Sequence, residues 1–216
     1  MRLQGRRASL LAGIVVIVGV GVAIAVATVG LSAGHGSTAL AGPPASCAPG
    51  CSSSSPGRLV LSASDVGSAY RVNSAVSGPR TLATVSAGDN PTVQSLIAKS
   101  WISGTEAAFN GRSGSVGVVS IADVFRPSSQ IDDILSAWQS DATQITSGAV
   151  QKLPSNAVGT RPVLIKGKVV DYGVLLYMWR HGNAIASVEM VGEEAQLDQN
   201  KLLDLARRQE AAIERS

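Results

Sequence analysis

An uninterrupted apolar stretch from Leu10 to Leu31 (LLAGIVVIVGVGVAIAVATVGL) is the feature that most constrains this chain. The stretch contains no charged residue, and a helix needs about 20 apolar residues to cross the hydrocarbon core of a bilayer. Because backbone amides in lipid must satisfy their own hydrogen bonds, a single spanning segment has to be a helix. We therefore predict one transmembrane helix over residues 10–31, preceded by a short stub of residues 1–9.

The charges on either side of this stretch predict its orientation. Arg2, Arg6 and Arg7 precede it, and the next charged residue is Arg58. Positively charged residues beside a membrane helix stay on the cytoplasmic side. We therefore predict a cytoplasmic stub, a helix in the cell membrane and an extracytoplasmic location for everything that follows.

Cleavage after Ala41 is the alternative to a retained anchor. Ala39-Leu40-Ala41 has the A-x-A form of a signal-peptidase site, and cleavage there would secrete the domain. We favour retention because the apolar run is longer than the core of a usual signal peptide.

Residues 32–57 predict a flexible tether that contains both cysteines. The segment is mostly Ala, Gly, Ser and Pro, so it cannot bury enough apolar surface to offset its ordering entropy. Outside the cytoplasm, Cys47 and Cys51 predict a local disulfide, and Pro49-Gly50 between them favours a turn. Free or intermolecular thiols are the alternative, and a metal site lacks the further ligands it would need.

Residues 58–216 predict one α+β domain, an antiparallel sheet packed by helices as in an α/β sandwich. The expected helices run from Pro91 to Gly104 with Asp89 or Asn90 as cap, over 131–145 with Ser129 and Asp132 as a capping pair, and over about 194–213. The expected strands are 116–125, 163–165, 169–171, 172–180 and 184–191. Residues 166–168 and 180–183 are expected to be turns.

Charge and composition give no support for nucleic-acid binding. Of the 18 lysines and arginines, three lie before the apolar stretch, so 15 remain to balance the 15 acidic residues of the domain. Nucleic-acid binding needs a concentrated positive field, and only 4% of the residues are aromatic. We therefore expect no nucleic-acid partner.

The sequence carries no catalytic or cofactor motif. Gly111-Arg112-Ser113-Gly114-Ser115 lacks the last glycine of G-x-S-x-G, and the histidines are His35 in the tether and His181 in a turn. We interpret His181 as a solvated turn residue, with a role as base or ligand as the alternative. We expect no catalytic residue, no metal ligand and no cofactor, and so no enzyme.

Three further features have a structural interpretation. Asp123 interrupts an apolar strand, so its carboxylate is either exposed at an edge or held by a partner such as an arginine; a functional role is the alternative. The adjacent Glu193-Glu194 is expected to favour the dipole of the closing helix. The three tryptophans lie on apolar stripes and are expected in the core: Trp101, Trp138 and Trp179.

Two segments of the domain carry a resemblance. Residues 177–184 (YMWRHGNA) and 206–210 (ARRQE) resemble a pattern in uncharacterised membrane-anchored envelope domains of actinobacteria. The plan from Arg58 to Ser216 also resembles the extracytoplasmic sensor domain of a mycobacterial receptor kinase and related lipoproteins with a PsbP-like α/β sandwich. This chain lacks the domain-spanning cysteines of those sensors. The resemblance implies a non-catalytic envelope module and identifies no site residue.

We therefore predict a membrane-anchored extracytoplasmic binding or accessory module of the bacterial cell envelope. Its partner is a lipid, a cell-wall fragment or an envelope protein. The first alternative is a structural partner of a membrane protein complex. The second is an extracytoplasmic hydrolase, which would require His181 or Asp123 to line a cleft beside a serine.

Overall fold

The computed structural model of the protein describes residues 56–112 and 116–216. The predicted stub, the apolar stretch 10–31, Ala41, and the Cys47 and Cys51 pair lie outside these residues. Among the described residues, no helix is long and apolar enough to cross a membrane.

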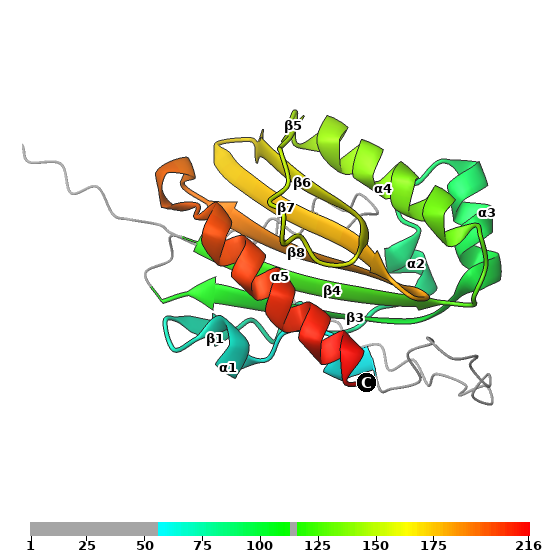
Figure 1. The fold of residues 1–216 in the computed structure, drawn as a ribbon, viewed down its shortest axis with the longest axis horizontal. Coiled ribbons are helices and arrows are strands. Elements are labelled where there is room, and N and C mark those ends of the chain that lie inside the picture. The colour runs from blue at the N-terminus through cyan, green and yellow to red at the C-terminus, as the bar shows by residue number, and fades with distance from the viewer. Residues whose placement is uncertain (1–55, 113–115) are drawn as a thin grey trace, which may run out of the picture.

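The described chain forms an eight-stranded antiparallel sheet with the spatial order β1-β3-β4-β8-β7-β6-β5, and β2 also pairs with β3 (Figure 1). The strands are β1 (Tyr70–Val72), β2 (Gly78–Pro79), β3 (Trp101–Gly111), β4 (Val116–Phe125), β5 (Ala149–Val150), β6 (Thr160–Val169), β7 (Tyr172–His181) and β8 (Ala184–Gly192). The helices are α1 (Ala63–Val66), α2 (Leu82–Val85), α3 (Pro91–Ser100), α4 (Ile131–Ile145) and α5 (Gln199–Glu214), with short 3-10 turns η1 (Pro56–Arg58) and η2 (Glu194–Gln196).

Helices cover both faces of the sheet. Helix α5 packs on one face against β7 and β8, and α4, with α3 beside it, packs on the other face against β6 and β7 (Figure 1). Strand β7 therefore contributes to two apolar cores, with Leu175, Tyr177 and Trp179 towards α5 and Val174, Leu176 and Met178 towards α4. Burial on both faces explains why the central strands are apolar without alternation.

Most of the elements predicted for the domain are confirmed. The fold is α+β with an antiparallel sheet, and β4 is central between β3 and β8. Asn90 caps α3 with Pro91 as its first residue, and α4 has the predicted bounds. Strands β7 and β8 form the predicted hairpin, with the turn at Gly182 and Asn183.

Two predictions based on glycine were wrong. Helix α3 ends at Ser100 instead of at Gly104, which lies in β3 opposite Asp123. The segment 166–168 is not a turn but part of the continuous strand β6, and the chain reverses at Val170 and Asp171. Gly167 is instead needed for close packing, because a Cβ at this position would lie 2.5 Å from the Thr146 carbonyl oxygen.

Two predicted helix starts also differ from the structure. Gln130 precedes α4 and makes no side-chain capping hydrogen bond, so Ser129 is not the cap. Glu194 belongs to η2 and pairs with Lys166 and Lys168, while Asp198 caps α5 through hydrogen bonds from the backbone N–H groups of Asn200 and Lys201. The Glu193-Glu194 pair therefore does not lie at the N-terminus of the closing helix.

Gly167→Ala tests the close packing of β6 against the loop after α4. We expect the substitution to lower the free energy of unfolding by about 1–3 kcal/mol, because the backbone of Thr146 must move away. Gly117→Ala is the matched control in β4, since its nearest neighbouring atom lies 3.6 Å away in ordinary contact. Equal denaturant midpoints for the two variants would contradict this role of Gly167.

Candidate functional site

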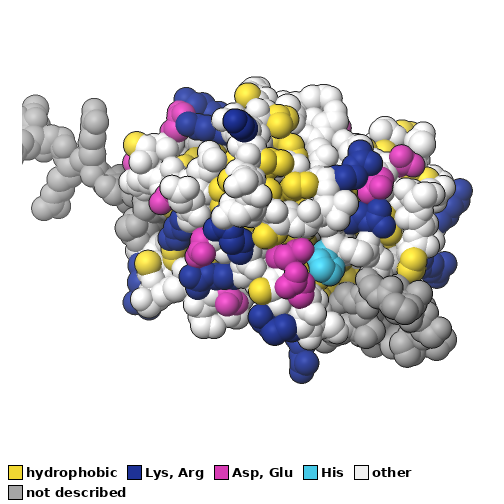
Figure 2. Space-filling view, in the orientation of Figure 1, with side chains coloured by type: hydrophobic (Ala, Val, Ile, Leu, Met, Phe, Trp, Pro, Cys, Tyr) yellow, Lys and Arg dark blue, Asp and Glu magenta, His cyan; other side chains and the backbone are white. Residues whose placement is uncertain are grey.

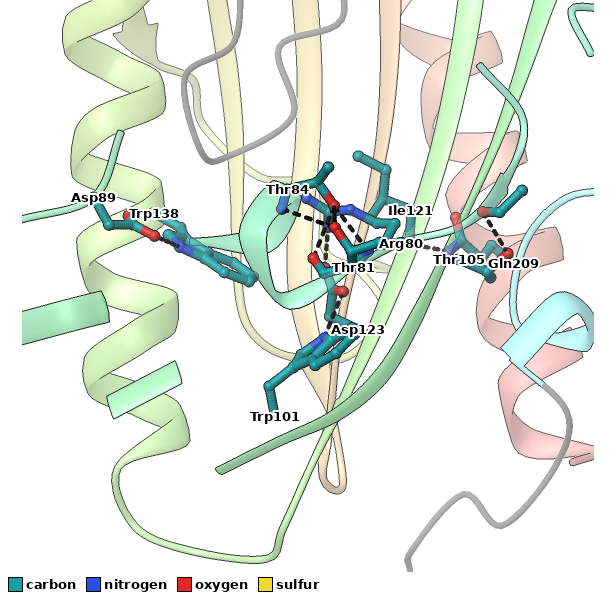
Figure 3. A network of polar contacts seen from close by, with 11 residues as sticks. Arg80, Thr81, Thr84, Asp89, Trp101, Thr105, Ile121, Asp123, Trp138 and Gln209 are labelled. Carbon is teal, nitrogen blue, oxygen red and sulfur yellow. Dashed lines mark hydrogen bonds and ion pairs between the residues drawn. The ribbon is translucent and has the colours of Figure 1, made fainter. Parts of the chain in front are cut away.

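The most unusual feature of the domain is a buried ion pair in the middle of the sheet. Asp123 of β4 pairs with Arg80, and their side chains are only 1% and 5% exposed. The indole N–H of Trp101 donates a hydrogen bond of 3.0 Å to Oδ1 of Asp123, and Figure 3 shows both partners pointing towards this carboxylate. The predicted arginine partner of Asp123 is therefore confirmed, whereas Trp101 is only partly buried.

The segment after β2 and the adjacent strand β3 position this pair. Arg80 directly follows β2, and its backbone N–H donates to the carbonyl oxygen of Gly104 at 2.9 Å, which docks the segment on β3. The next residue, Thr81, begins α2 with a capping box that includes Thr84 (Figure 3). Gly104 leaves the space in which the Asp123 carboxylate lies, because a Cβ there would collide with it.

Two glutamates lie on the same face of the sheet as Asp123. Glu106 of β3 is two residues beyond Gly104, and Glu189 of β8 pairs with Val119 of β4. Glu189 is 2% exposed and Glu106 is partly buried. The Oε1 atom of each glutamate is buried without a hydrogen-bond partner, a rare and costly state for a polar atom in a folded protein.

Burial dominates the electrostatics of this acidic cluster, which we define as Glu106, Asp123 and Glu189. Desolvation raises the pKa of Asp123 and of Glu106, and Arg80 opposes the rise in both. The pKa of Glu189 lies well above its ordinary value, because the group is buried and Glu106 adds repulsion. Arg80 thus opposes the pKa shifts of Asp123 and Glu106, and it already pairs with Asp123.

A further buried carboxyl group, outside the cluster, is that of Asp89. Asp89 is 6% exposed and accepts a hydrogen bond of 3.3 Å from the indole N–H of Trp138 in α4 (Figure 3). Desolvation raises the pKa of Asp89 from 3.8 to about 6, against the opposing effect of the Trp138 hydrogen bond. Trp138 is itself in the core, as predicted.

A small cavity adjoins the ion pair. Its volume of about 10 Å³ is room for roughly one water molecule. Its lining combines polar groups with apolar walls: Arg80, Ile121, Asp123, Trp138, Met178, Ile185 and Ser187. Asp123 and Ser187 therefore meet the condition of an acid beside a serine, but the carboxylate of Asp123 is occupied by Arg80 and Trp101.

His181 lies on the opposite face and is not a solvated turn residue. Its Nδ1 atom is 2.9 Å from Oε1 of Glu210 in α5, and its side chain is 33% exposed. The indole N–H of Trp179 donates to the other oxygen of Glu210 at 2.6 Å. Figure 2 shows the histidine on the α5 face beside acidic side chains. The two segments that carry the resemblance thus contact each other, in a network that fastens α5 to β7.

Sequence reasoning missed three residues of the site: Arg80, Glu106 and Glu189. Glu189 had a detectable signal, because it interrupts the apolar strand ASVEMV in the same way that Asp123 interrupts VSIADVF. Arg80 had none, since any of the basic residues of the domain could have been the partner of Asp123.

Comparison of the sequence with protein families and with curated proteins finds no match in either. Among solved structures, the chain is similar to the extracellular domain of PknH from Mycobacterium tuberculosis, with 12% sequence identity and a TM-score of 0.49. The similarity covers 76% of this chain and 98% of that domain. No residue, ligand or role of this chain follows from this similarity.

Arg80→Met tests how strongly the buried pair holds the edge segment. We expect a loss of about 3–5 kcal/mol in the free energy of unfolding, because the carboxylate of Asp123 remains buried without its cation. Adding Asp123→Asn is expected to recover part of the loss, since the amide oxygen still accepts from Trp101. Arg208→Met is the control, because its pair with Asp204 is exposed. Additive losses in the double variant would contradict the coupling.

Asp89→Asn tests the pH dependence of stability. Because the folded pKa of Asp89 is about 6 and its ordinary value is 3.8, its contribution is fully present below pH 3.8 and is lost as pH rises through 6. The melting temperature of the variant relative to the unsubstituted protein should therefore increase between pH 4 and pH 7. Asp133→Asn, at an exposed position of α4, should show a constant difference. A constant difference for Asp89→Asn would refute the assignment.

Proposed function

We propose that this chain is an extracytoplasmic binding or accessory module of the bacterial cell envelope, held to the membrane by residues 10–31. The acidic cluster with its Arg80 partner is the binding site in this proposal. On this view the protein is not an enzyme.

The observation that carries the proposal is the presence of two buried carboxyl oxygens without partners, on Glu106 and Glu189. Burying an ionisable group without a partner lowers stability, and such groups are found preferentially where a ligand or a reaction uses them. A purely structural sheet would be more stable with apolar residues at these positions, as at the neighbouring Val119 and Ile121.

The membrane attachment in the proposal rests on the sequence. An apolar stretch long enough to span a bilayer follows three arginines, and the domain begins after a tether that is poor in large apolar residues. A module attached in this way would encounter envelope lipids, cell-wall fragments and other membrane proteins.

Two exposed valines support the role of a structural partner in a membrane complex as a second candidate. Val150 of β5 is 62% exposed, and Val170, at the tip of the β6–β7 hairpin, is 83% exposed. Val170 also adopts a φ of +56°, which is costly for a β-branched residue. If this edge binds a protein, Val150→Asn with Val170→Asn should release the full-length chain from a larger complex on a native gel.

Native mass spectrometry of the full-length protein, expressed in an actinobacterial host and released gently from membranes, tests the binding role. We expect a bound small molecule in the unsubstituted protein. The adduct should be absent from a Glu106→Gln/Glu189→Gln variant and present in the control Glu193→Gln/Glu214→Gln, whose side chains are exposed. A bare chain in all three samples would count against the binding module.

A further inference from the structure

We propose that Glu106 and Glu189 together bind a compact organic cation, a primary ammonium group, on the α4 face of the sheet. This inference rests on the proposed function and specifies the chemical class of its ligand.

The register of the sheet places the two glutamates on one face. Strands β3 and β8 flank β4, and Glu106, Ile121 and Ser187 form one row across the three strands. Glu189 is two residues beyond Ser187, so both glutamates project from the same face. Two strand spacings and this two-residue offset separate their backbones by about 12 Å, a distance that two extended glutamate side chains can bridge with an ammonium group between them.

The surface between the two glutamates is apolar. Ala108, Val119 and Ile121 form a small buried cluster there, and Val76 packs against it. An apolar floor with two carboxyl groups above it provides a low-dielectric site, in which a charged ligand interacts strongly with its counter-charges. Glu106 is the more exposed of the two glutamates, so in this proposal the ligand enters from its side.

The site holds three carboxyl groups and one cation, and that cation, Arg80, is paired with Asp123. Within the described chain, Glu106 and Glu189 therefore have no cation of their own. In this proposal, a ligand with one positive charge takes the place of a proton shared by the two glutamates. The ammonium group then forms a hydrogen-bonded ion pair with the carboxylate, and the displaced proton leaves to the buffer.

The number of acceptors favours an ammonium group over a metal ion. An ammonium group has three N–H donors, and the register places three acceptors on this face: Oε1 of Glu106, Oε1 of Glu189 and the hydroxyl oxygen of Ser187. A metal ion needs about four to eight ligands, and the described residues contain no group of three His, Cys, Asp or Glu side chains that could hold one.

Calorimetric titration of the full-length protein in detergent at pH 7 tests this assignment, with propylammonium chloride as probe and tetramethylammonium chloride as control. We expect saturable binding of propylammonium alone, with proton release revealed by buffers of different ionisation enthalpy. Glu189→Gln should weaken binding by at least about tenfold, and the control Glu193→Gln should not change it. Glutamine resembles the protonated acid in shape, so the variant should melt close to the unsubstituted protein.

The source of the ammonium group is distinguished by two further arms of the experiment. If the ligand is a soluble amine, 1,5-diaminopentane should bind saturably in detergent. If the ligand is a lipid headgroup, a binding signal should occur only in nanodiscs that contain phosphatidylethanolamine. Either result supports an ammonium site if Glu189→Gln abolishes it.

Three outcomes would overturn the inference. They are no saturable binding, equal binding of tetramethylammonium, or propylammonium binding that Glu189→Gln leaves unchanged. If native mass spectrometry meanwhile finds a bound molecule without an amino group, the binding module stands and the ammonium assignment alone falls.

Discussion

The ion pair between Arg80 and Asp123 is the interaction on which the arrangement of this domain depends. It joins the short edge segment after β2 to the central strand β4, across the intervening strand β3. Because its two side chains are almost completely buried, the pair is stable only while both partners are present. Trp101 and the absence of a side chain at Gly104 complete the space around the carboxylate.

The same pair determines the electrostatics of its surroundings. Arg80 pairs with Asp123 and opposes the rise in the pKa of Glu106 only in part, and Glu106 itself raises the pKa of Glu189. Among the residues that the structure describes, neither glutamate has a cation of its own. The two faces of the sheet differ in this respect. On the α5 face, buried polar groups are satisfied, with Ser120 donating to Gln209 at 2.8 Å and Glu210 accepting from Trp179. The contrast supports a binding role for the α4 face.

Hydrophobic periodicity predicted the long helices and strands of the fold. Glycines, read as turn or termination signals, did not predict where these elements end. The apolar stripe from Ile131 to Ile145 reflects burial of one helix face against the sheet. Strands β4, β7 and β8 are apolar on both faces because they are buried on both faces. In the sequence, Gly104 and Gly167 cannot be distinguished from glycines that form turns. In the structure they leave space for Asp123 and Thr146, two residues that are distant in sequence. Such contacts depend on tertiary packing and leave no local pattern.

The candidate site was predictable only where a charge broke an apolar run. Asp123 was recognised for this reason, and Glu189 follows the same rule within β8. Their convergence with Arg80 and Glu106 depends on the register of β3, β4 and β8, which the sequence did not specify.

The most direct test of the account is the thermal stability of the full-length protein with Glu189→Met, a substitution of similar volume. If Glu189 is retained for binding, replacing its unpartnered carboxyl group with an apolar side chain should raise the free energy of unfolding by about 1–3 kcal/mol. The melting temperature would then increase by several degrees. A lower melting temperature would show that Glu189 stabilises the fold, and it would contradict the assignment of the acidic cluster as a binding site.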